Sequence, residues 1–344
     1  MSLRFLVRRS RKHLYLALLV LVFAGAGLFF LLGKIAGYFL VDREIAIKED
    51  PARIKVLLHD TQTVVEMGLE EYLMGVVAAE MPASFELEAL KAQAVAARTY
   101  AVKRLLVPDP RVKKIKPDAD ISTDHTINQA WISTAEMRKR WGKWNYAAHR
   151  KKIKEAIEGT KGQVLVYQGQ IIDPVYHASC GGQGTENSGE VWKVDLPYLR
   201  RVACTGHQDR HAAEQRSYSI REIDALLGTS LNALPASNLA KNAGILAVKQ
   251  KSRSGRVLEV SVAGKTFSGA ELRAKLELPS TRFSWQLKEG KLHIQTNGYG
   301  HGVGMCQYGA NDLAGQGKNY DEILKHYYTG VEIAAIKTGK NWAE

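Results

Sequence analysis

The stretch LEEYLMGVVAAEMPASFELEALKAQAVAARTYAVKRLL, residues 69–106, decides the fold. Apolar residues recur at helical spacing in its first part, and Pro82 disfavours helix at the residue before it, so we expect a first helix to end at about Glu80. A second helix, which Ser84 can cap, should continue to about Leu106. Because alanine lies on nearly every side of this second helix, the stretch predicts two closely packed helices.

Three charged residues of this stretch are candidates for chemistry. Glu80 lies where the first helix ends, beside carbonyl oxygens that disfavour negative charge, so its pKa should be raised. A carboxylic acid that stays protonated near neutral pH suits a general acid, although an exposed helix-end glutamate is the simpler interpretation. Lys91 and Arg98 project from nearly the same side of the second helix, where each needs a structural carboxylate or a ligand as its partner.

The surrounding segments predict an α+β fold with an inserted small β-rich subdomain. Two short strands should precede the helix pair, and the polar segment 107–131, which contains three prolines, should be a loop. The other expected elements are surface helices over 133–141 and 145–160, a hairpin around Gln168-Gly169, the insertion over about 216–296 with a Ser219–Glu222 capping box and a hairpin at Glu289-Gly290, and helices over 305–317 and 320–330.

The amino terminus predicts a membrane anchor. RFLVRRSRKH carries five cations just before an uncharged run of about twenty residues, which is long enough to span a bilayer. This order predicts a single-pass cell-membrane protein with a cytoplasmic amino terminus, although a cleaved signal peptide is the alternative. The expected segments are a basic cytoplasmic tail (1–13), a transmembrane anchor (14–33), a linker (34–52), an extracytoplasmic domain (53–336) and a C-terminal tail (337–344).

The net charge of the chain limits the classes of partner that it is expected to bind. Among 344 residues, 48 Lys and Arg stand against 35 Asp and Glu, a formal net charge of +13. Such an excess favours anionic surroundings, including nucleic acid, membrane headgroups and acidic wall polymers. Because the working part is expected outside the cytoplasm, we exclude nucleic acid and expect lipid headgroups or the cell wall.

A second motif, YHASCGGQGTENSGEVWKVDLPYL (176–199), offers polar side chains at the end of a predicted strand. His177, Ser179 and the following cysteine invite a nucleophile interpretation, but the G-x-S-x-G context is missing and no base can be placed. Trp192 followed by Lys193 fits stacking on a sugar ring, although a tryptophan in the core is equally common.

A third motif, NGYGHGVGMCQYGA (297–310), is rich in glycine but matches no phosphate site. It lacks both the G-x-G-x-x-G spacing of dinucleotide-binding folds and the Lys-Ser/Thr of a P-loop. Zinc bound by His301 and Cys306, with help from His177 or the other cysteines, has no recognised ligand spacing. The glycines therefore indicate a backbone that closely approaches a ligand or another element.

Taken together, the blocks 70–101, 176–202 and 298–328 resemble the SpoIID/LytB family, in the order in which that family has them. The resemblance implies that Glu80 is the catalytic acid and that Arg98 and Lys193 support the active cleft. Some members bind zinc through two cysteines six residues apart, but this chain has Ser122 and Asn128 at the corresponding positions. We therefore expect no metal and no cofactor.

The resemblance also implies a function. We expect a peptidoglycan lytic transglycosylase that cleaves glycan strands to anhydro-muramyl ends in sporulation or wall remodelling. The alternatives are a non-catalytic wall-binding enhancer of a peptidoglycan amidase and, more distantly, an exported metal-dependent hydrolase. The glycine-rich motif then forms the wall of a glycan cleft opposite Glu80. The residues expected to contact substrate are Lys91, Arg98, His177, Ser179, Trp192, Lys193, His301 and Gln307.

Three cysteines complete the set of candidates: Cys180, Cys204 and Cys306. Export permits disulfides, and the first two flank the Trp192 segment, so a bond between them can staple it and leave Cys306 as the odd thiol. Pairing of Cys180 with Cys306, or metal binding shared among the cysteines, stays open.

Overall fold

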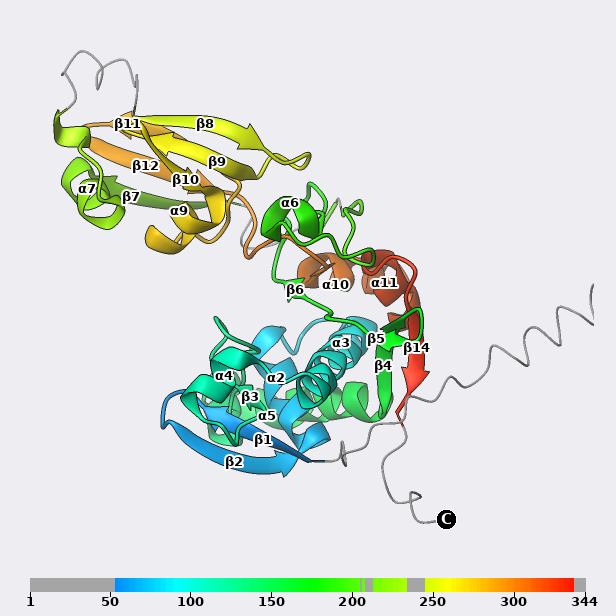
Figure 1. The fold of residues 1–344 in the computed structure, drawn as a ribbon. Coiled ribbons are helices and arrows are strands. Elements are labelled where there is room, and N and C mark those ends of the chain that lie inside the picture. The colour runs from blue at the N-terminus through cyan, green and yellow to red at the C-terminus, as the bar shows by residue number, and fades with distance from the viewer. Residues whose placement is uncertain (1–52, 205, 208–212, 234–244, 337–344) are drawn as a thin grey trace, which may run out of the picture. The chain divides into compact units, whose positions relative to one another are not determined.

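The computed structural model describes residues 53–204, 206–207, 213–233 and 245–336 (Figure 1). The expected anchor, its flanking segments and the C-terminal tail lie outside these residues. Within the described ranges, no helix combines the length and the apolar composition that crossing a bilayer requires. The mixture of helices with several small sheets confirms the α+β class.

Helices and strands alternate irregularly along the chain. The helices are α2 Leu69–Glu80, α3 Leu87–Leu106, α4 Pro110–Ile115, α5 Thr134–Glu158, α6 Ser188–Trp192, α7 Ile220–Leu227, η1 Leu231–Ala233, α9 Gly269–Lys275, α10 Gln307–Gly315 and α11 Tyr320–Tyr327. The strands are β1 Arg53–Leu58, β2 Thr63–Gly68, β3 Ile121–Ser122, β4 Gln163–Tyr167, β5 Gln170–Ile171, β6 Tyr176–His177, β7 Glu214–Ser219, β8 Leu246–Lys251, β9 Val257–Val262, β10 Lys265–Ser268, β11 Phe283–Lys288, β12 Lys291–Thr296, β13 Met305–Cys306 and β14 Glu332–Ala335.

The helix pair α2 and α3 ends where the sequence predicts, and α3 is the central helix. It packs against α2, α5, α10, α11 and β4, and all of its alanines are fully buried. Its many small side chains let five elements approach one helix closely. The predicted Ser84 cap is wrong, since Glu86 holds the cap position. The Phe85 N–H donates to the Pro82 carbonyl at 3.0 Å, and this turn takes up Ser84 before the helix begins.

Residues 107–131 are not the loop that the prolines suggested. Pro110 begins α4, where a helix needs no backbone donor, and the Asp109 side chain caps it by accepting from the Arg111 N–H at 2.9 Å. β3 then pairs in parallel with β1 and completes the sheet β2-β1-β3. This segment is held to β1 by β3, and it leads the chain back to the carboxyl end of α2.

The two predicted surface helices form a single element, α5, with a kink between them. Gly142 has φ 68°, a left-handed value that breaks the helical path without strain in glycine. Beyond α5, the predicted hairpin at Gln168-Gly169 is confirmed as β4 and β5, and β14 joins it in the sheet β14-β4-β5. β6 and β13 pair in parallel, which brings the second and third sequence motifs together.

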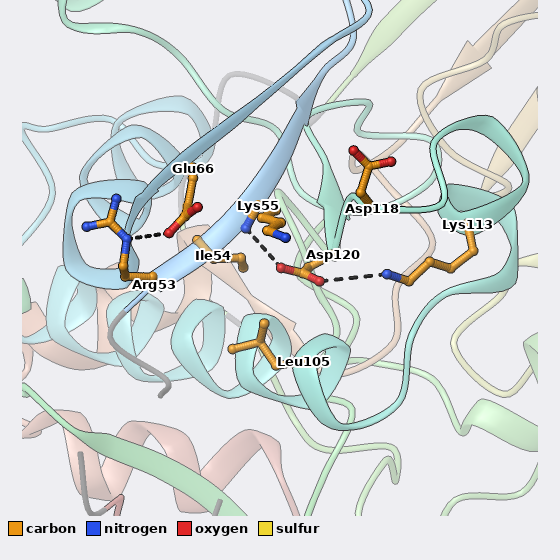
Figure 2. Close-up of a pocket in the computed structure, with 8 residues that line it drawn as sticks. All are labelled: Arg53, Ile54, Lys55, Glu66, Leu105, Lys113, Asp118 and Asp120. Carbon is orange, nitrogen blue, oxygen red and sulfur yellow. Dashed lines mark hydrogen bonds and ion pairs between the residues drawn. The ribbon is translucent and has the colours of Figure 1, made fainter. Parts of the chain in front are cut away.

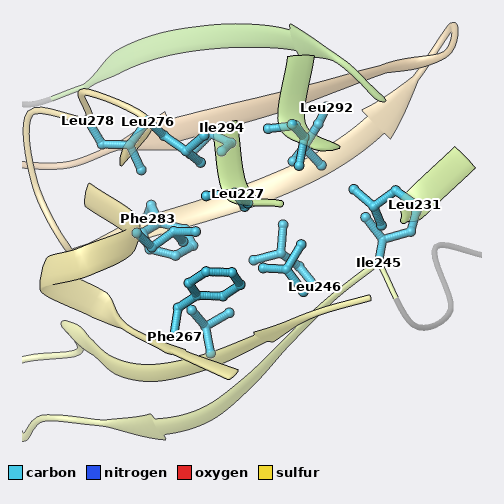
Figure 3. Close-up of a cluster of buried hydrophobic side chains, with 14 of the residues drawn as sticks. Leu227, Leu231, Ile245, Leu246, Phe267, Leu276, Leu278, Phe283, Leu292 and Ile294 are labelled. Carbon is cyan, nitrogen blue, oxygen red and sulfur yellow. The ribbon is translucent and has the colours of Figure 1, made fainter. Parts of the chain in front are cut away.

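The segment expected as an insertion has an apolar core of its own (Figure 3). It contains two three-stranded sheets, β10-β9-β8 and β11-β12-β7, with the helices α7 and α9. Both the Ser219–Glu222 capping box and the turn at Glu289-Gly290 are present. The apolar side chains labelled in Figure 3 are Leu227, Leu231, Ile245, Leu246, Phe267, Leu276, Leu278, Phe283, Leu292 and Ile294.

The glycines of the third motif allow close backbone approach, as the sequence predicts. Gly302 and Gly304 both have positive φ, and a Cβ on them would lie 2.5 Å from the Arg256 Nε and 2.0 Å from the Val175 carbonyl oxygen. Arg256, which belongs to the insertion, donates to the Gly300 carbonyl at 2.9 Å. The insertion therefore holds the glycine-rich segment from one side while the chain leading into β6 holds it from the other.

Candidate active site

A cavity of about 810 Å³ lies beside the carboxyl end of α2. Its volume falls in the range of ligand sites. Aromatic and imidazole side chains from β6, α6 and the glycine-rich motif line it together with the end of α2. The predicted site residues that it brings together are Glu80, His177, Trp192, His301 and Gln307.

The Glu80 carboxyl group accepts hydrogen bonds from two donors. The Ala130 N–H donates to its Oε1 at 3.1 Å, and the Gln307 Nε2 donates to its Oε2 at 3.4 Å. Burial raises the pKa of Glu80 to about 7, although both hydrogen bonds act in the opposite direction. The direction agrees with the prediction, but the cause is desolvation of the carboxyl group. Glu80 can therefore hold its proton much closer to neutral pH than an exposed glutamate does.

A polar network lies next to the carboxyl group. Gln307 also donates to the Gln93 Oε1 at 3.3 Å. Gln129 accepts from the Tyr72 hydroxyl at 3.2 Å and donates to the Tyr176 hydroxyl at 2.8 Å. Burial raises the pKa of both tyrosines, so they stay neutral beside the acid. Gln129 and Tyr176 were missed at the sequence level, since nothing in their local pattern sets them apart.

A second cavity of about 510 Å³ adjoins the other side of Glu80. Its lining includes Arg140, Trp141 and His149 from α5, and the Arg140 Nη1 donates to the Ala78 carbonyl at 2.9 Å. Ala79 and Glu80 are therefore lining residues of both cavities.

Two neutral imidazoles form the wall of the larger cavity. The His177 Nδ1 lies 3.1 Å from the Val303 carbonyl and donates to it, which leaves Nε2 as an acceptor. That Nε2 is buried and has no partner among the described residues. Burial, followed by the charge of Arg256, lowers the pKa of His177 to about 3, and burial likewise lowers that of His301. The Trp192 ring lies 5.1 Å from the His301 ring, so aromatic surface continues along the wall.

Arg98 does not reach either cavity, contrary to the expectation. Its side chain is fully buried and forms a bidentate ion pair with Glu70, at 2.9 and 2.7 Å. Its remaining donors reach Thr160 and the carbonyls of Ile157 and Gln163. Arg98 therefore joins α2, α3 and α5, and a structural carboxylate rather than a ligand is its partner.

Three other residues that were predicted to contact the substrate, Lys91, Ser179 and Lys193, do not line either cavity. Lys91 pairs with Glu88 at 2.7 Å and lies over the Tyr320 ring. Ser179 is buried, and its hydroxyl accepts from the Gly181 N–H at 3.0 Å. Lys193 is exposed at the end of α6, in a left-handed conformation with φ 59°. Lys193 directly follows Trp192, and Ser179 directly follows Ala178, so both neighbour residues of the cavity wall.

The three cysteines are buried free thiols that gather around one histidine. The expected Cys180–Cys204 disulfide is absent from the structure. Instead, the sulfurs of Cys180, Cys204 and Cys306 and a ring nitrogen of His207 all lie within 4.8 Å of one another. We name these four residues the thiol cluster. His207 was missed from the sequence, although its position three residues after Cys204 was the available signal.

Ser122 and Asn128, which stand where some members of the resembled family have a zinc-binding cysteine pair, are hydrogen-bonded to each other. The Asn128 side chain accepts from the Ser122 N–H at 2.9 Å and donates to the Tyr100 hydroxyl at 3.0 Å. These groups therefore contribute hydrogen bonds within the segment between α4 and α5.

Another cavity, of about 330 Å³, lies between β1 and the end of α3 (Figure 2). Four of its charged side chains form two ion pairs. Arg53 contacts Glu66 at 2.5 Å, and Asp120 contacts Lys113 at 3.7 Å while accepting from the Lys55 N–H. Because two carboxylates of this cavity are already held in ion pairs, it is a weaker candidate than the one at Glu80.

Comparisons with known proteins identify relatives of this chain. The family model described as "SpoIID: Stage II sporulation protein" matches residues 58–167, which include Glu80. Stage II sporulation protein D of Bacillus subtilis is 37% identical over 289 residues, covering 84% of this chain and 80% of that protein. The protein of the same name from Bacillus amyloliquefaciens is 36% identical over 292 residues, covering 85% and 81%.

A third relative carries a different name. The amidase enhancer of Bacillus subtilis is 29% identical over 312 residues, covering 76% of this chain and 40% of that protein. Because the two sporulation proteins are well above 30% identical and share most of their length with this chain, the chain belongs to the SpoIID/LytB family.

Proposed function

We propose that this protein is a peptidoglycan lytic transglycosylase with Glu80 as its single acid and base. One observation carries the proposal: among the described residues, Glu80 is the only carboxylate that lines either cavity beside it, and its pKa is raised to about 7. Glycosidases that use water pair two carboxyl groups, about 5–9.5 Å apart. A reaction in which the sugar supplies its own nucleophile needs only one.

The chemistry requires one proton to move out and one to move back. Protonated Glu80 donates its proton to the glycosidic oxygen, the bond to the anomeric carbon breaks, and the leaving strand departs with a new hydroxyl group. The resulting carboxylate then accepts the proton of the muramic acid C6 hydroxyl as that oxygen attacks the anomeric carbon. The products are an anhydro-muramyl end and a regenerated acid, and no water is consumed.

The cavity walls supply groups that suit a glycan. The unpartnered Nε2 of neutral His177 can accept a hydrogen bond from a sugar hydroxyl. Trp192 is 39% exposed and lines the cavity, so a sugar ring can pack on its face. The second cavity, with Trp141, leaves room for the strand beyond the cleaved bond.

The place of action follows from the amino-terminal sequence. We propose that residues 14–33 anchor the chain in the cell membrane with its amino terminus in the cytoplasm and the Glu80 domain outside. Five cations before an uncharged run of about twenty residues support this orientation. There, a chain with net charge +13 faces anionic wall polymers.

A second candidate is an enhancer that binds the wall and stimulates a peptidoglycan amidase without cutting glycan. The relative named amidase enhancer favours it. Such a protein can keep the cavity and its aromatic wall but does not depend on the proton held by Glu80.

The test compares the full chain with Glu80→Gln, which keeps the shape of the side chain but cannot release a proton. The chain is recovered from the membrane fraction in detergent and incubated with purified sacculi, and anhydro-muramyl products are measured. We expect the Gln variant to lose at least about a hundredfold in rate. Glu71→Gln, an exposed position on the same helix, is the matched control and should cleave normally.

Three outcomes would count against these assignments. Equal cleavage by the Gln variant would remove Glu80 from the mechanism. If neither form releases anhydro products while both stimulate an added amidase equally, the enhancer role replaces the enzyme. Recovery of the intact chain in the soluble fraction would contradict the anchor.

A further inference from the structure

The thiol cluster brings together three segments of chain that lie far apart in sequence. Cys180 follows β6, Cys204 and His207 follow the Trp192 segment, and Cys306 ends β13. All three cysteine side chains are almost completely buried, with exposed fractions of 0%, 6% and 0%. Three buried thiols and a partly buried imidazole form a set of four soft donors without a disulfide.

The distances within the cluster match those between ligands of one metal ion. The His207 Nε2 lies 3.2 Å from the Cys180 sulfur and 3.7 Å from the Cys306 sulfur, and all four donor atoms lie within 4.8 Å of one another. Around tetrahedral zinc, with Zn–S near 2.3 Å and Zn–N near 2.0 Å, sulfurs lie about 3.8 Å apart and a sulfur and a nitrogen about 3.5 Å.

The neighbours of the cluster suit thiolates. The N–H groups of Cys180 and Gly309 approach the Cys306 sulfur at 3.3 and 3.4 Å, and the Tyr327 hydroxyl lies 3.2 Å from the Cys204 sulfur. Such contacts to ligand sulfurs are the usual outer shell of a thiolate metal site. Cys204 and His207, with two residues between them, also have the short spacing common in zinc-binding pairs.

We propose that Cys180, Cys204, His207 and Cys306 bind a structural zinc ion. Four protein ligands fill a tetrahedral shell and leave no position for water or substrate, which distinguishes a structural site from a catalytic one. The expectation of no metal followed from Ser122 and Asn128, whereas metal binding shared among the three cysteines stayed open, and His207 supplies the fourth ligand.

The position of the ion gives it a mechanical role at the cleft. One ligand precedes the Trp192 segment, two follow it, and the fourth is adjacent to Gln307, the donor to Glu80. Zinc therefore fixes the aromatic wall and the acid-contacting helix α10 relative to each other. Its content can be measured without any assay of glycan cleavage, so this inference stands or fails independently of the proposed activity.

The experiment measures zinc in the full chain, purified in detergent and dialysed against a weak chelator. We expect a single zinc ion per chain, and after exchange with Co²⁺ a thiolate-to-metal charge-transfer band with the visible bands of tetrahedral cobalt. His207→Ala should weaken metal binding by more than about 100-fold, since loss of an outer-shell partner alone costs about 10–100-fold. His207→Cys restores a four-donor set and should keep the metal, which separates lost ligation from failed folding.

Two histidines serve as matched controls. His326 lies next to the cluster and bonds the Ala203 carbonyl at 2.8 Å, and His301 belongs to the cavity wall. His326→Ala and His301→Ala should both retain zinc. The proposal is overturned if wild-type protein contains no zinc and gives no cobalt thiolate band, if His207→Ala binds metal as tightly as wild type, or if thiol mapping finds a disulfide among the three cysteines.

Discussion

Cys306 and Gln307 are neighbours in the sequence, yet their side chains belong to two different buried polar groups. Gln307 donates to Glu80 in the cavity, whereas Cys306 belongs to the thiol cluster. Around Glu80, polar atoms still lack protein partners among the described residues, as the His177 Nε2 does. Around Cys306, backbone N–H groups and other thiols already approach the sulfur.

This difference separates a reactive site from a structural one. Burial raises the pKa of Glu80 because only two donors replace the water it has lost, and the proton held there is available for transfer. The thiols of the cluster are also buried, but their three sulfurs and a ring nitrogen of His207 already lie within 4.8 Å of one another. The same short segment, at the start of α10, therefore contributes to chemistry through one residue and to rigidity through the residue before it.

The largest effect that we predict concerns the close packing of the thiol cluster. In Gly309→Ala, the new Cβ would lie 2.2 Å from the Tyr327 hydroxyl and 2.3 Å from the Cys204 sulfur. Since both neighbours are buried, the free energy of unfolding should fall by about 3 kcal/mol, the upper end of the usual overpacking effect. Chemical denaturation followed by circular dichroism measures it.

Gly315→Ala is the matched control because it lies on the same helix with no atom within 4 Å of the added Cβ. It should raise stability by about 0.5–1 kcal/mol through helix propensity. Equal stability of the two variants would show that the thiol cluster is loosely packed. The thiol cluster would then not differ in packing from the polar groups around Glu80.

The second prediction concerns the cost of keeping Glu80 in the cavity. The pKa rises from 4.5 in the unfolded chain to about 7 in the folded one, so the folded state binds the proton more tightly. The stability this provides is complete below about pH 4.5 and is lost as the pH rises through about 7. Relative to Glu80→Gln, the wild type should therefore lose about 1–2 kcal/mol over that range, after allowance for solvent near a half-buried group.

Denaturant titrations of both proteins at matched pH values measure this difference and cancel the other titrating groups. A gap that stays constant from pH 4.5 to 8 would mean that the folded structure does not hold the Glu80 proton. Burial would then not explain how Glu80 stays protonated and acts as a catalytic acid.

The local parts of the fold and site could be predicted from the sequence. Pro82 ends α2 by a steric effect on its immediate neighbour, which also places Glu80 at the helix end. Partners brought in by tertiary folding could not be predicted. Arg98 finds Glu70 on the adjacent helix, and the Cys306 sulfur reaches Cys180 only because β13 pairs with β6. Charge and spacing identified these residues as unusual but did not indicate whether protein or ligand satisfies them.

The smallest effect should come from Gln307→Ala, which removes one long hydrogen bond from Glu80. That bond lowers the pKa of Glu80, so its loss raises the pKa further and moves the basic limb of the pH–rate profile upward. The carboxylate that must accept the sugar proton also loses a donor, and turnover should fall roughly threefold to tenfold. Gln316→Ala, an exposed position just beyond α10, should change neither quantity. Release of anhydro products across a pH series measures both. An unmoved basic limb would show that Gln307 does not contact the acid during turnover, and the division between Cys306 and Gln307 would then have no functional meaning.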